Sequence, residues 1–321
     1  MGNPTISVII PTVGRSQPLS DCIESILCQI MLPTEIIVID CSTGQRAYEV
    51  LARYQAQSET LGVSLRYIHS DVSNASLQKN VGISASRGDI ICFLDDDVLL
   101  ERTYLSVVME AFRSHPDVVG VGGFILSPKS DSGPKLWFKR MFLMNHDHGF
   151  GVMQRSGFPA MQLGRRDIER PTATQLLMGC ACYRREAIAQ YGGFDEELGI
   201  THVWEDIDLP CRLSKYHGLL YVPEARMTHR HSPGGRMSLT RYSACYMYNH
   251  FYLFDKFVPH TPFNWLCFVW SHIGSIIYML VLGLTTANPL AALRGVSRGN
   301  LWITRRILRG WRPTYDVVAE M

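Results

Sequence analysis

Four short runs of mostly apolar residues alternate with helical patterns in the first hundred residues, and this alternation constrains the fold more than any other feature. The runs cover 6–10, 35–39, 64–68 and 89–94 and are rich in β-branched residues. Between the first two runs, apolar residues recur at spacings of three and four over 19–30. Continuous apolar strands joined by amphipathic helices are typical of a parallel sheet covered by helices on both faces. The sequence therefore predicts an α/β fold.

Side chains with ligand chemistry stand where three of these runs end, at Thr12, Asp40 and the triplet Asp95, Asp96 and Asp97. In parallel sheets, ligands bind at the carboxyl ends of the strands. Adjacent carboxylates repel one another, and hard divalent cations such as Mg²⁺ or Mn²⁺ favour carboxylate oxygens and are often shared with substrate phosphates. The triplet thus predicts a cation site that grips a diphosphate. The alternative is a solvated acidic turn.

Two downstream clusters carry further chemistry. Glu205, Asp206 and Asp208 open a predicted helix, where acidic residues are also ordinary partners of the helix dipole. A carboxylate poised in a cleft is a suitable general base, and this pattern alone leaves all three residues as candidates. His229 follows the strand-like segment 219–222, and a neutral imidazole there is suited to complete the coordination of a cation held by Asp97. Its alternative is a solvated surface histidine.

Two further regions differ from this pattern. Residues 127–172 contain glycines, prolines, basic pairs and weak periodicity, which predicts an irregular loop region with substrate contacts. Within it His146 and His148, on either side of Asp147, are either metal ligands or, more commonly for loop histidines, solvated. The stretch 257–293 contains no Lys, Arg, Asp or Glu, and 265–284 is long enough to cross a bilayer.

A basic tail follows that apolar stretch, with arginines interleaved with Leu, Ile and Trp. Arginine with tryptophan on an amphipathic helix is typical of contact with an anionic membrane surface. The alternative is a buried helix at a homo-oligomer interface. We therefore expect two parts: a catalytic domain over 1–240, divided into 1–126 and 127–240, and a C-terminal helical region over 241–321 that associates with a membrane or oligomerises.

Composition narrows the class of protein. A formal net charge of only +2 gives no reason to expect nucleic acid as a partner. The nine cysteines are scattered without a C-x-x-C pair, which favours a reducing compartment over a disulfide scaffold. The first 17 residues lack a basic stretch followed by an apolar one, so no signal peptide is expected.

Taken together, the motifs are recognisable as a set. In chain order they cover 8–12 with Arg15, 36–40, 79–82, 88–97, 179–185, 192–196, 205–209 and 223–229. Over roughly residues 5 to 235 the chain resembles the family 2 glycosyltransferases, which have a GT-A fold, are inverting and metal-dependent, and use nucleotide sugars. The resemblance implies a Rossmann-like, mixed but mostly parallel sheet with helices on both faces.

The resemblance also implies a role for individual residues. Those expected to bind the nucleotide sugar are Pro11, Thr12, Arg15, Asp40, Lys79, Asn80, Asp95 and Asp96. Asp97, with Asp95 and His229, would hold Mn²⁺ or Mg²⁺, and Asp206, beside Glu205, would be the catalytic base. Gly193, Phe194 and Asp195 would border the acceptor. The chain departs from the family pattern at Lys79, where arginine is usual and gives a planar fork that lysine lacks, and at Cys41, where a second acid or an amide often follows Asp40.

The expected activity is a single in-line displacement that moves a sugar, most often from a UDP donor, to a hydroxyl of a lipid-linked or polysaccharide acceptor. We expect the enzyme at the cytoplasmic face of the inner membrane, attached peripherally or monotopically. The alternatives are a processive polysaccharide synthase, which usually has several spans and a Q-x-x-R-W segment, and a non-catalytic binding module. A nucleotidyltransferase is excluded because its glycine-rich loop and early lysine are missing: the first lysine here is Lys79.

Overall fold

The structure is a computed structural model that describes residues 4–126, 133–144, 151–160, 168–200, 202–232, 237–314 and 317–318. The strands are β1 (Ile6–Thr12), β2 (Glu35–Asp40), β3 (Ser64–His69), β4 (Ile90–Phe93), β5 (Val98–Leu100), β6 (Val118–Leu126), β7 (Val152–Met153), β8 (Pro159–Ala160), β9 (Thr172–Thr174), β10 (Ala181–Arg184) and β11 (Gly218–His229). The helices are α1 (Ser16–Leu27), α2 (Arg46–Thr60), α3 (Ala75–Ala85), α4 (Tyr104–Ser114), α5 (Gly133–Met141), α6 (Arg185–Tyr191), α7 (Glu196–Gly199), α8 (Asp208–Leu213), α9 (Leu239–Phe257), α10 (Pro262–Thr285) and α11 (Pro289–Arg309).

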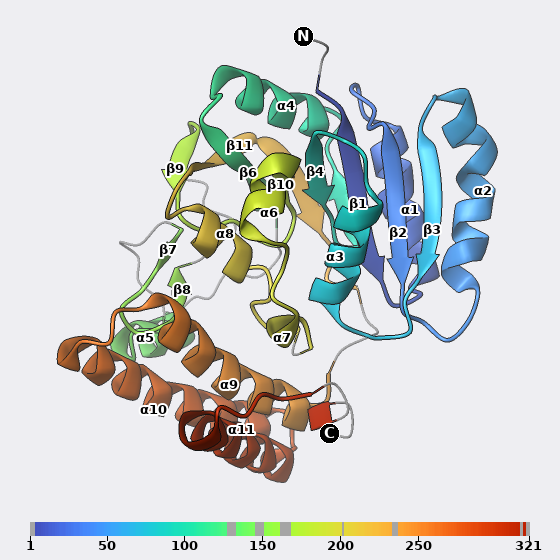
Figure 1. Ribbon diagram of the computed structural model, residues 1–321. Helices are drawn as coiled ribbons and strands as arrows, with labels where there is room; N and C mark the ends of the chain where they lie inside the picture. Colours follow the sequence, from blue (N-terminus) through green and yellow to red (C-terminus); the bar gives the residue numbers. More distant parts are fainter. Residues whose placement is uncertain are drawn as a thin grey trace.

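A mixed sheet forms the centre of the described structure, in the order β3-β2-β1-β4-β10-β6-β11-β5, with β9 added beside β11 (Figure 1). The four predicted strands are β1 to β4, and they pair in parallel. In the second half β10 runs antiparallel between β4 and β6, while β11 is parallel to β6. The predicted α/β sheet is therefore confirmed. At the carboxyl ends of β1 and β2, Thr12 lies directly opposite Asp40.

Alternation along the strands separates two apolar layers, because successive side chains in a strand point to opposite faces. Val8 and Ile36 belong to the core that packs against α1, α2 and α4. Ile9 and Ile37 belong to the core on the other face, which includes residues of α6 and α8 and packs against α3. Both faces of the parallel strands are thus covered, which explains why these runs are apolar throughout.

Two details differ from the sequence prediction. Helix α1 ends at Leu27, and Ile30, the last residue of the predicted apolar repeat, is 68% exposed. The region 127–172 is less irregular than predicted, because α5 and the β7–β8 pair lie within it. The periodicity is weak there because α5 buries none of its side chains and so needs no apolar stripe. His146, Asp147 and His148 lie outside the described residues.

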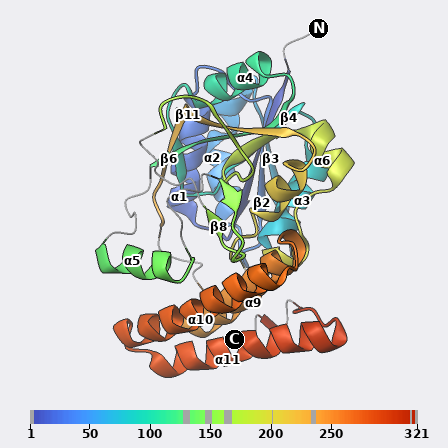
Figure 2. The ribbon, with the colours of Figure 1, turned by 90° about the vertical axis from the view of Figure 1, so that its left-hand side faces the viewer.

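The last three helices lie below the sheet and build a third core together with segments that precede them (Figure 2). Helix α11 approaches α9 closely at two glycines one helical turn apart. A Cβ at Gly295 would lie 2.4 Å from the backbone oxygen of Thr240, and one at Gly299 would lie 2.6 Å from that of Ala244. These glycines therefore set the spacing between the two helices.

We expect Gly299→Val to destabilise the protein by roughly 2 kcal/mol, because the new side chain meets rigid backbone rather than a flexible side chain. Denaturant unfolding measures this loss. Ser297→Val is the matched control, since it places the same side chain on an exposed position of the same helix. Equal stability of the two variants would contradict the close approach of α11 to α9.

Candidate active site

The acidic triplet follows β4, and its carboxylates differ in their partners, although Arg15 reaches both Asp96 and Asp97. Asp96 points inward and is 1% exposed. Its Oδ2 accepts a hydrogen bond from Thr12 Oγ1 at 2.6 Å and one from Arg15 Nε at 3.2 Å, while a second guanidinium nitrogen of Arg15 binds Oδ1. Thr12 and Arg15 are predicted to bind the nucleotide sugar, and in the structure they hold Asp96 in place. The structure brings these three residues together, and their contact with a nucleotide stays a prediction.

Asp97 faces His229, which the pairing of β11 with β5 places opposite Val98. His229 Nε2 lies 3.0 Å from Asp97 Oδ1 and 3.8 Å from Asp95 Oδ2. The backbone N–H of Ser232 donates to Asp97 Oδ2 at 2.8 Å. Burial raises the pKa of Asp97, but His229, Ser232 and Arg15 outweigh it and leave the pKa at about 2. Asp97 is therefore a permanent carboxylate at neutral pH.

Asp95, Asp97 and His229 fit a divalent cation. One potential ligand atom from each lies within 4.8 Å of the others. Asp97 Oδ1 is buried and lies 3.0 Å from His229 Nε2, so two potential ligand atoms of one cation face each other. Two carboxylates and one imidazole form a donor set suited to Mn²⁺, and the carboxylates also suit Mg²⁺.

Glu205 and Asp206 lie in a turn that precedes α8, which corrects the predicted start of that helix. The helix begins at Asp208 rather than at Trp204, because His202 and Trp204 adopt left-handed backbone conformations with φ of 49° and 60°. Non-glycine residues rarely adopt such angles, and they cluster at functional sites where the surroundings enforce them. Here α9 provides those surroundings, since its Tyr246 ring centroid lies 4.7 Å from that of Trp204.

Lys79 is buried beside these carboxylates, and its Nζ lies 3.4 Å from Glu205 Oε1. Burial raises the pKa of Glu205, but the charge of Lys79 outweighs it, so the pKa of Glu205 is lowered. For Asp206 the balance is opposite: burial, helped by the charges of Glu205 and Asp95 against that of Lys79, raises its pKa to about 7. Two adjacent acids thus acquire different protonation behaviour.

The predicted acceptor-side residues are held by Asn80. The Asn80 amide donates to the Phe194 carbonyl at 3.0 Å and to Glu196 Oε1 at 2.9 Å, and its oxygen accepts from the Phe194 N–H at 2.8 Å. A Cβ at Gly193 would lie 2.2 Å from the Asn80 oxygen, so a side chain at this position would push the Asn80 amide out of these hydrogen bonds. The observed contacts of Asn80 position this loop, whereas its predicted contact with the donor stays a prediction.

Asp195 and Asp40 have their own local partners. Asp195 caps α7 through Glu197 N–H and accepts from Tyr252 OH and Lys256 Nζ, both at 2.5 Å, on α9. Asp40 is fully buried at the end of β2, beside Pro11 and Thr12 of β1. It accepts from the N–H and Oγ of Ser42, at 2.9 and 2.8 Å, which closes the turn after the strand.

Sequence reasoning did not single out three residues that shape the site. A Cβ at Gly179 would lie 3.3 Å from Asp206 Oδ2, so this glycine keeps the space beside the acid open. His202, three residues before Glu205, contributes a lowering influence on the pKa of Glu205. Ser232 acts through its backbone, whose N–H donates to Asp97 and whose carbonyl accepts from Arg15 at 3.2 Å, and a sequence carries no signal for such contacts. Of these three residues, Gly179 could have been found from the sequence, because it begins one of the matched motifs.

With this geometry established, known proteins identify the family. The family model described as "Glycosyl transferase family 2" matches residues 7–192, more than half of the chain. The chain belongs to glycosyl transferase family 2. The matched segment contains β1 from Ser7 onward and the acidic triplet, but it ends before Gly193, Glu205, Asp206 and His229.

Individual proteins agree with this membership. The uncharacterised glycosyltransferase EpsJ of Bacillus subtilis is 31% identical over 37% of this chain, and the match spans 34% of that relative's length. The glucosyl-dolichyl phosphate glucuronosyltransferase of Haloferax volcanii is 25% identical over 70% of this chain and 69% of its own. The crystal structure of GalNAc-T7 with UDP, GalNAc and Mn²⁺ is 15% identical with a TM-score of 0.56, covering 90% of this chain and 59% of that one. The predicted GT-A fold class is thereby confirmed.

We expect Asp97→Ala to weaken Mn²⁺ binding by more than about tenfold, the loss typical of changes around metal ligands. Titration of Mn²⁺ followed by its free-ion paramagnetic resonance signal measures the affinity. Asp71→Ala is the control, because that carboxylate is 97% exposed and does not belong to the three-residue set. Thermal unfolding without metal checks that the fold survives, and a folded Asp97→Ala protein with unchanged Mn²⁺ affinity would remove Asp97 from the metal site.

Proposed function

We propose that the protein is an inverting glycosyltransferase that moves a sugar from a nucleotide-diphosphate sugar to an acceptor hydroxyl. The observation that carries the proposal is the juxtaposition of two kinds of carboxylate. Asp97 is fully ionised in a donor set that fits a cation, whereas the pKa of Asp206 is raised to about 7, in part by Asp95 of that set. A cation-binding carboxylate and a separate proton acceptor are the two groups that such a transfer requires.

The proposed reaction is one displacement at the anomeric carbon. Asp206 accepts the proton of the acceptor hydroxyl while that oxygen attacks and the bond to the nucleotide diphosphate breaks, which inverts the anomeric configuration. Glu205, held ionised by Lys79, keeps a negative charge beside Asp206 and so increases its proton affinity. A Mn²⁺ or Mg²⁺ ion held by Asp95, Asp97 and His229 would stabilise the negative charge on the leaving diphosphate as a Lewis acid.

For the donor we propose a UDP-sugar, to be bound by Pro11, Thr12, Arg15, Asp40, Lys79, Asn80, Asp95 and Asp96. The presence of UDP and Mn²⁺ in the GalNAc-T7 structure supports this choice by analogy of fold. For the acceptor we propose a lipid-linked or polysaccharide hydroxyl bordered by Gly193, Phe194 and Asp195. The H. volcanii relative is a glucosyl-dolichyl phosphate glucuronosyltransferase, which supports the lipid-linked class.

We also propose the predicted two-part organisation, with the catalytic part over 1–240 and the helical part over 241–321, and attachment to the cytoplasmic face of a membrane. The apolar helix α10 supports attachment: among the described residues it is the one helix long and apolar enough to cross a bilayer. The test of the whole proposal is release of nucleotide from UDP-, dTDP- and GDP-sugars, with Mn²⁺, Mg²⁺ or EDTA and a membrane lipid extract as acceptor.

We expect Asp206→Asn to lower kcat by about 10²- to 10⁴-fold, because the amide cannot accept the acceptor proton. Donor affinity, measured by calorimetry with the UDP-sugar and Mn²⁺, should stay within a few-fold of the unchanged protein. Glu186→Gln is the control, since this glutamate lies on the exposed side of α6. Retained turnover in Asp206→Asn would move the base to Glu205 or Asp208.

The pH dependence of kcat/KM should show an acid limb near pH 7, where Asp206 gains its proton. The base works only when ionised, so activity is present above the pKa of about 7 and is lost as the pH falls through it. Glu205→Gln removes a charge that raises this pKa, so its limb should move to lower pH. A limb that stays in place in Glu205→Gln would show that another group titrates.

A further inference from the structure

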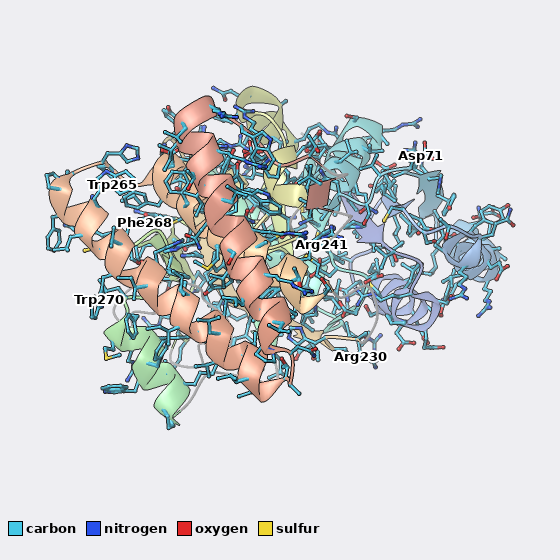
Figure 3. The ribbon with its side chains drawn as sticks, turned by 90° about the horizontal axis from the view of Figure 1, so that it is seen from below. Asp71, Arg230, Arg241, Trp265, Phe268 and Trp270 are labelled. Atoms are coloured by element: carbon cyan, nitrogen blue, oxygen red, sulfur yellow. The ribbon has the colours of Figure 1, made fainter. Side chains whose placement is uncertain are left out.

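Exposed apolar side chains gather on three helices at one side of the molecule. Among the described residues, 15 of the 21 large apolar side chains that are exposed lie on α5, α10 and α11. Figure 3, seen from below, shows α10 and α11 across the side nearest the viewer with α5 next to α10. We call the outward side of these three helices the lower face. An apolar area of this extent is unusual on a soluble monomer and indicates a binding surface.

Helix α10 has its polar side chains turned inward and its apolar ones outward. Ser271 and Ser275 are fully buried, and Ser271 Oγ donates to the Ser156 carbonyl at 3.2 Å. Outward positions are apolar along the whole helix, from Leu266 at 65% exposure to Leu284 at 68%. A helix that faces water has the opposite arrangement. The lower face is therefore built for an apolar environment.

Helix α11 adds positive charge to this face. Leu290, Leu293, Leu301 and Leu308 are exposed on it together with Arg294, Arg298, Arg305 and Arg309. No Asp or Glu occurs in the sequence of α5, α10 or α11. The two ends of a lipid molecule match this combination, because leucines suit acyl chains and arginines suit anionic headgroups. A second copy of the chain, joined through the same face, would instead bring arginines toward arginines.

The contacts of α10 along its length oppose a transmembrane orientation. In its middle, His272 Nε2 lies 3.0 Å from Asn300 Oδ1 of α11, and a Cβ at Gly274 would lie 2.3 Å from the side chain of Phe142. Near its end, a Cβ at Gly283 would lie 2.5 Å from Ala292 Cβ. Crossing a bilayer would separate α10 from these neighbours and expose its buried serines to lipid.

We propose that the lower face is a monotopic membrane-binding surface that docks on an anionic lipid bilayer, with α10 and α11 lying in the plane of the headgroups. This inference deepens the proposed localisation and does not depend on the proposed activity. Trp270 would lie at the interfacial depth that tryptophan favours. Its indole N–H donates to the Met141 carbonyl at 2.8 Å, which ties α10 to the end of α5 within the same surface.

Flotation of the full chain with vesicles tests the proposal. We expect binding to phosphatidylcholine–phosphatidylglycerol vesicles, and at least about tenfold weaker binding for Leu266→Glu/Val281→Glu, which places charge in the apolar layer. Arg294→Gln/Arg298→Gln should weaken binding to these vesicles while leaving weak binding to pure phosphatidylcholine unchanged. Ile30→Glu and Arg113→Gln are matched controls, because both side chains are exposed and lie elsewhere.

Two results would overturn the proposal. One is that the full chain does not bind the vesicles, or that Leu266→Glu/Val281→Glu binds them as tightly as the unchanged chain does. The other is that the unchanged chain does not bind vesicles but forms a concentration-dependent dimer, and that this variant stays monomeric. A second copy of the chain would then cover the lower face. If the unchanged chain binds vesicles but transfers no sugar from any of the donors, this result would contradict only the proposed function.

Depth measurements test the in-plane orientation. Fluorophores on Leu266→Cys, Ile273→Cys and Leu284→Cys, corrected for labelling of the unsubstituted chain, should be quenched equally by spin-labelled lipids of shallow depth. A transmembrane helix would instead place Ile273 near the bilayer centre and its two ends at opposite surfaces. Deep quenching of Ile273 alone would therefore exclude the monotopic arrangement.

Discussion

Three adjacent carboxylates at the end of a buried strand have to be stabilised separately, and the site depends on how this is achieved. Asp96 is neutralised inside the protein by Arg15 and by the hydroxyl of Thr12. Asp97 faces His229, and its second oxygen is fixed by a backbone N–H. Arg15 binds both oxygens of Asp96 and also reaches Asp97 Oδ2 at 3.3 Å, whereas Asp97 Oδ1 and Asp95 Oδ2 face His229, where a cation fits. The middle aspartate thus organises the pair beside it.

A buried lysine, Lys79, gives the second group of acids, Glu205 and Asp206, different protonation behaviour. Lys79 Nζ lies next to Glu205, and it also lies 4.9 Å from the centre of the Phe194 ring. A compact ammonium fits between a carboxylate and a ring face where the wider guanidinium of the usual arginine needs planar partners. Lys79 keeps Glu205 ionised, and Glu205 in turn raises the proton affinity of Asp206. The departure from the family pattern is therefore accommodated by chemistry local to this chain.

The sequence was sufficient for features that rest on local patterns. β1 to β4 follow from apolar runs, and the gathering of Thr12, Asp40 and the triplet follows from the rule that parallel strands end at one edge. The sequence was insufficient where contacts between distant residues determine the local structure. The left-handed backbone at Trp204 is imposed by packing against α9, and the Asn80 contacts join residues more than a hundred positions apart. The roles predicted for individual site residues rest on the family resemblance and stay predictions.

The loop that contains the predicted acceptor-side residues Phe194 and Asp195 is held from two directions, and one of them leads to the lower face. From the sheet side, Asn80 fixes Phe194. From the opposite side, α9 reaches the loop through Lys256, whose Nζ lies 2.5 Å from Asp195 and 2.6 Å from Asp208, two residues after Asp206. Since α11 also binds the loop's helix α7, through Arg306 and Glu197 at 2.6 Å, a membrane that positions α10 and α11 also positions this loop. A lipid-linked acceptor would then meet the site at a height fixed by α9.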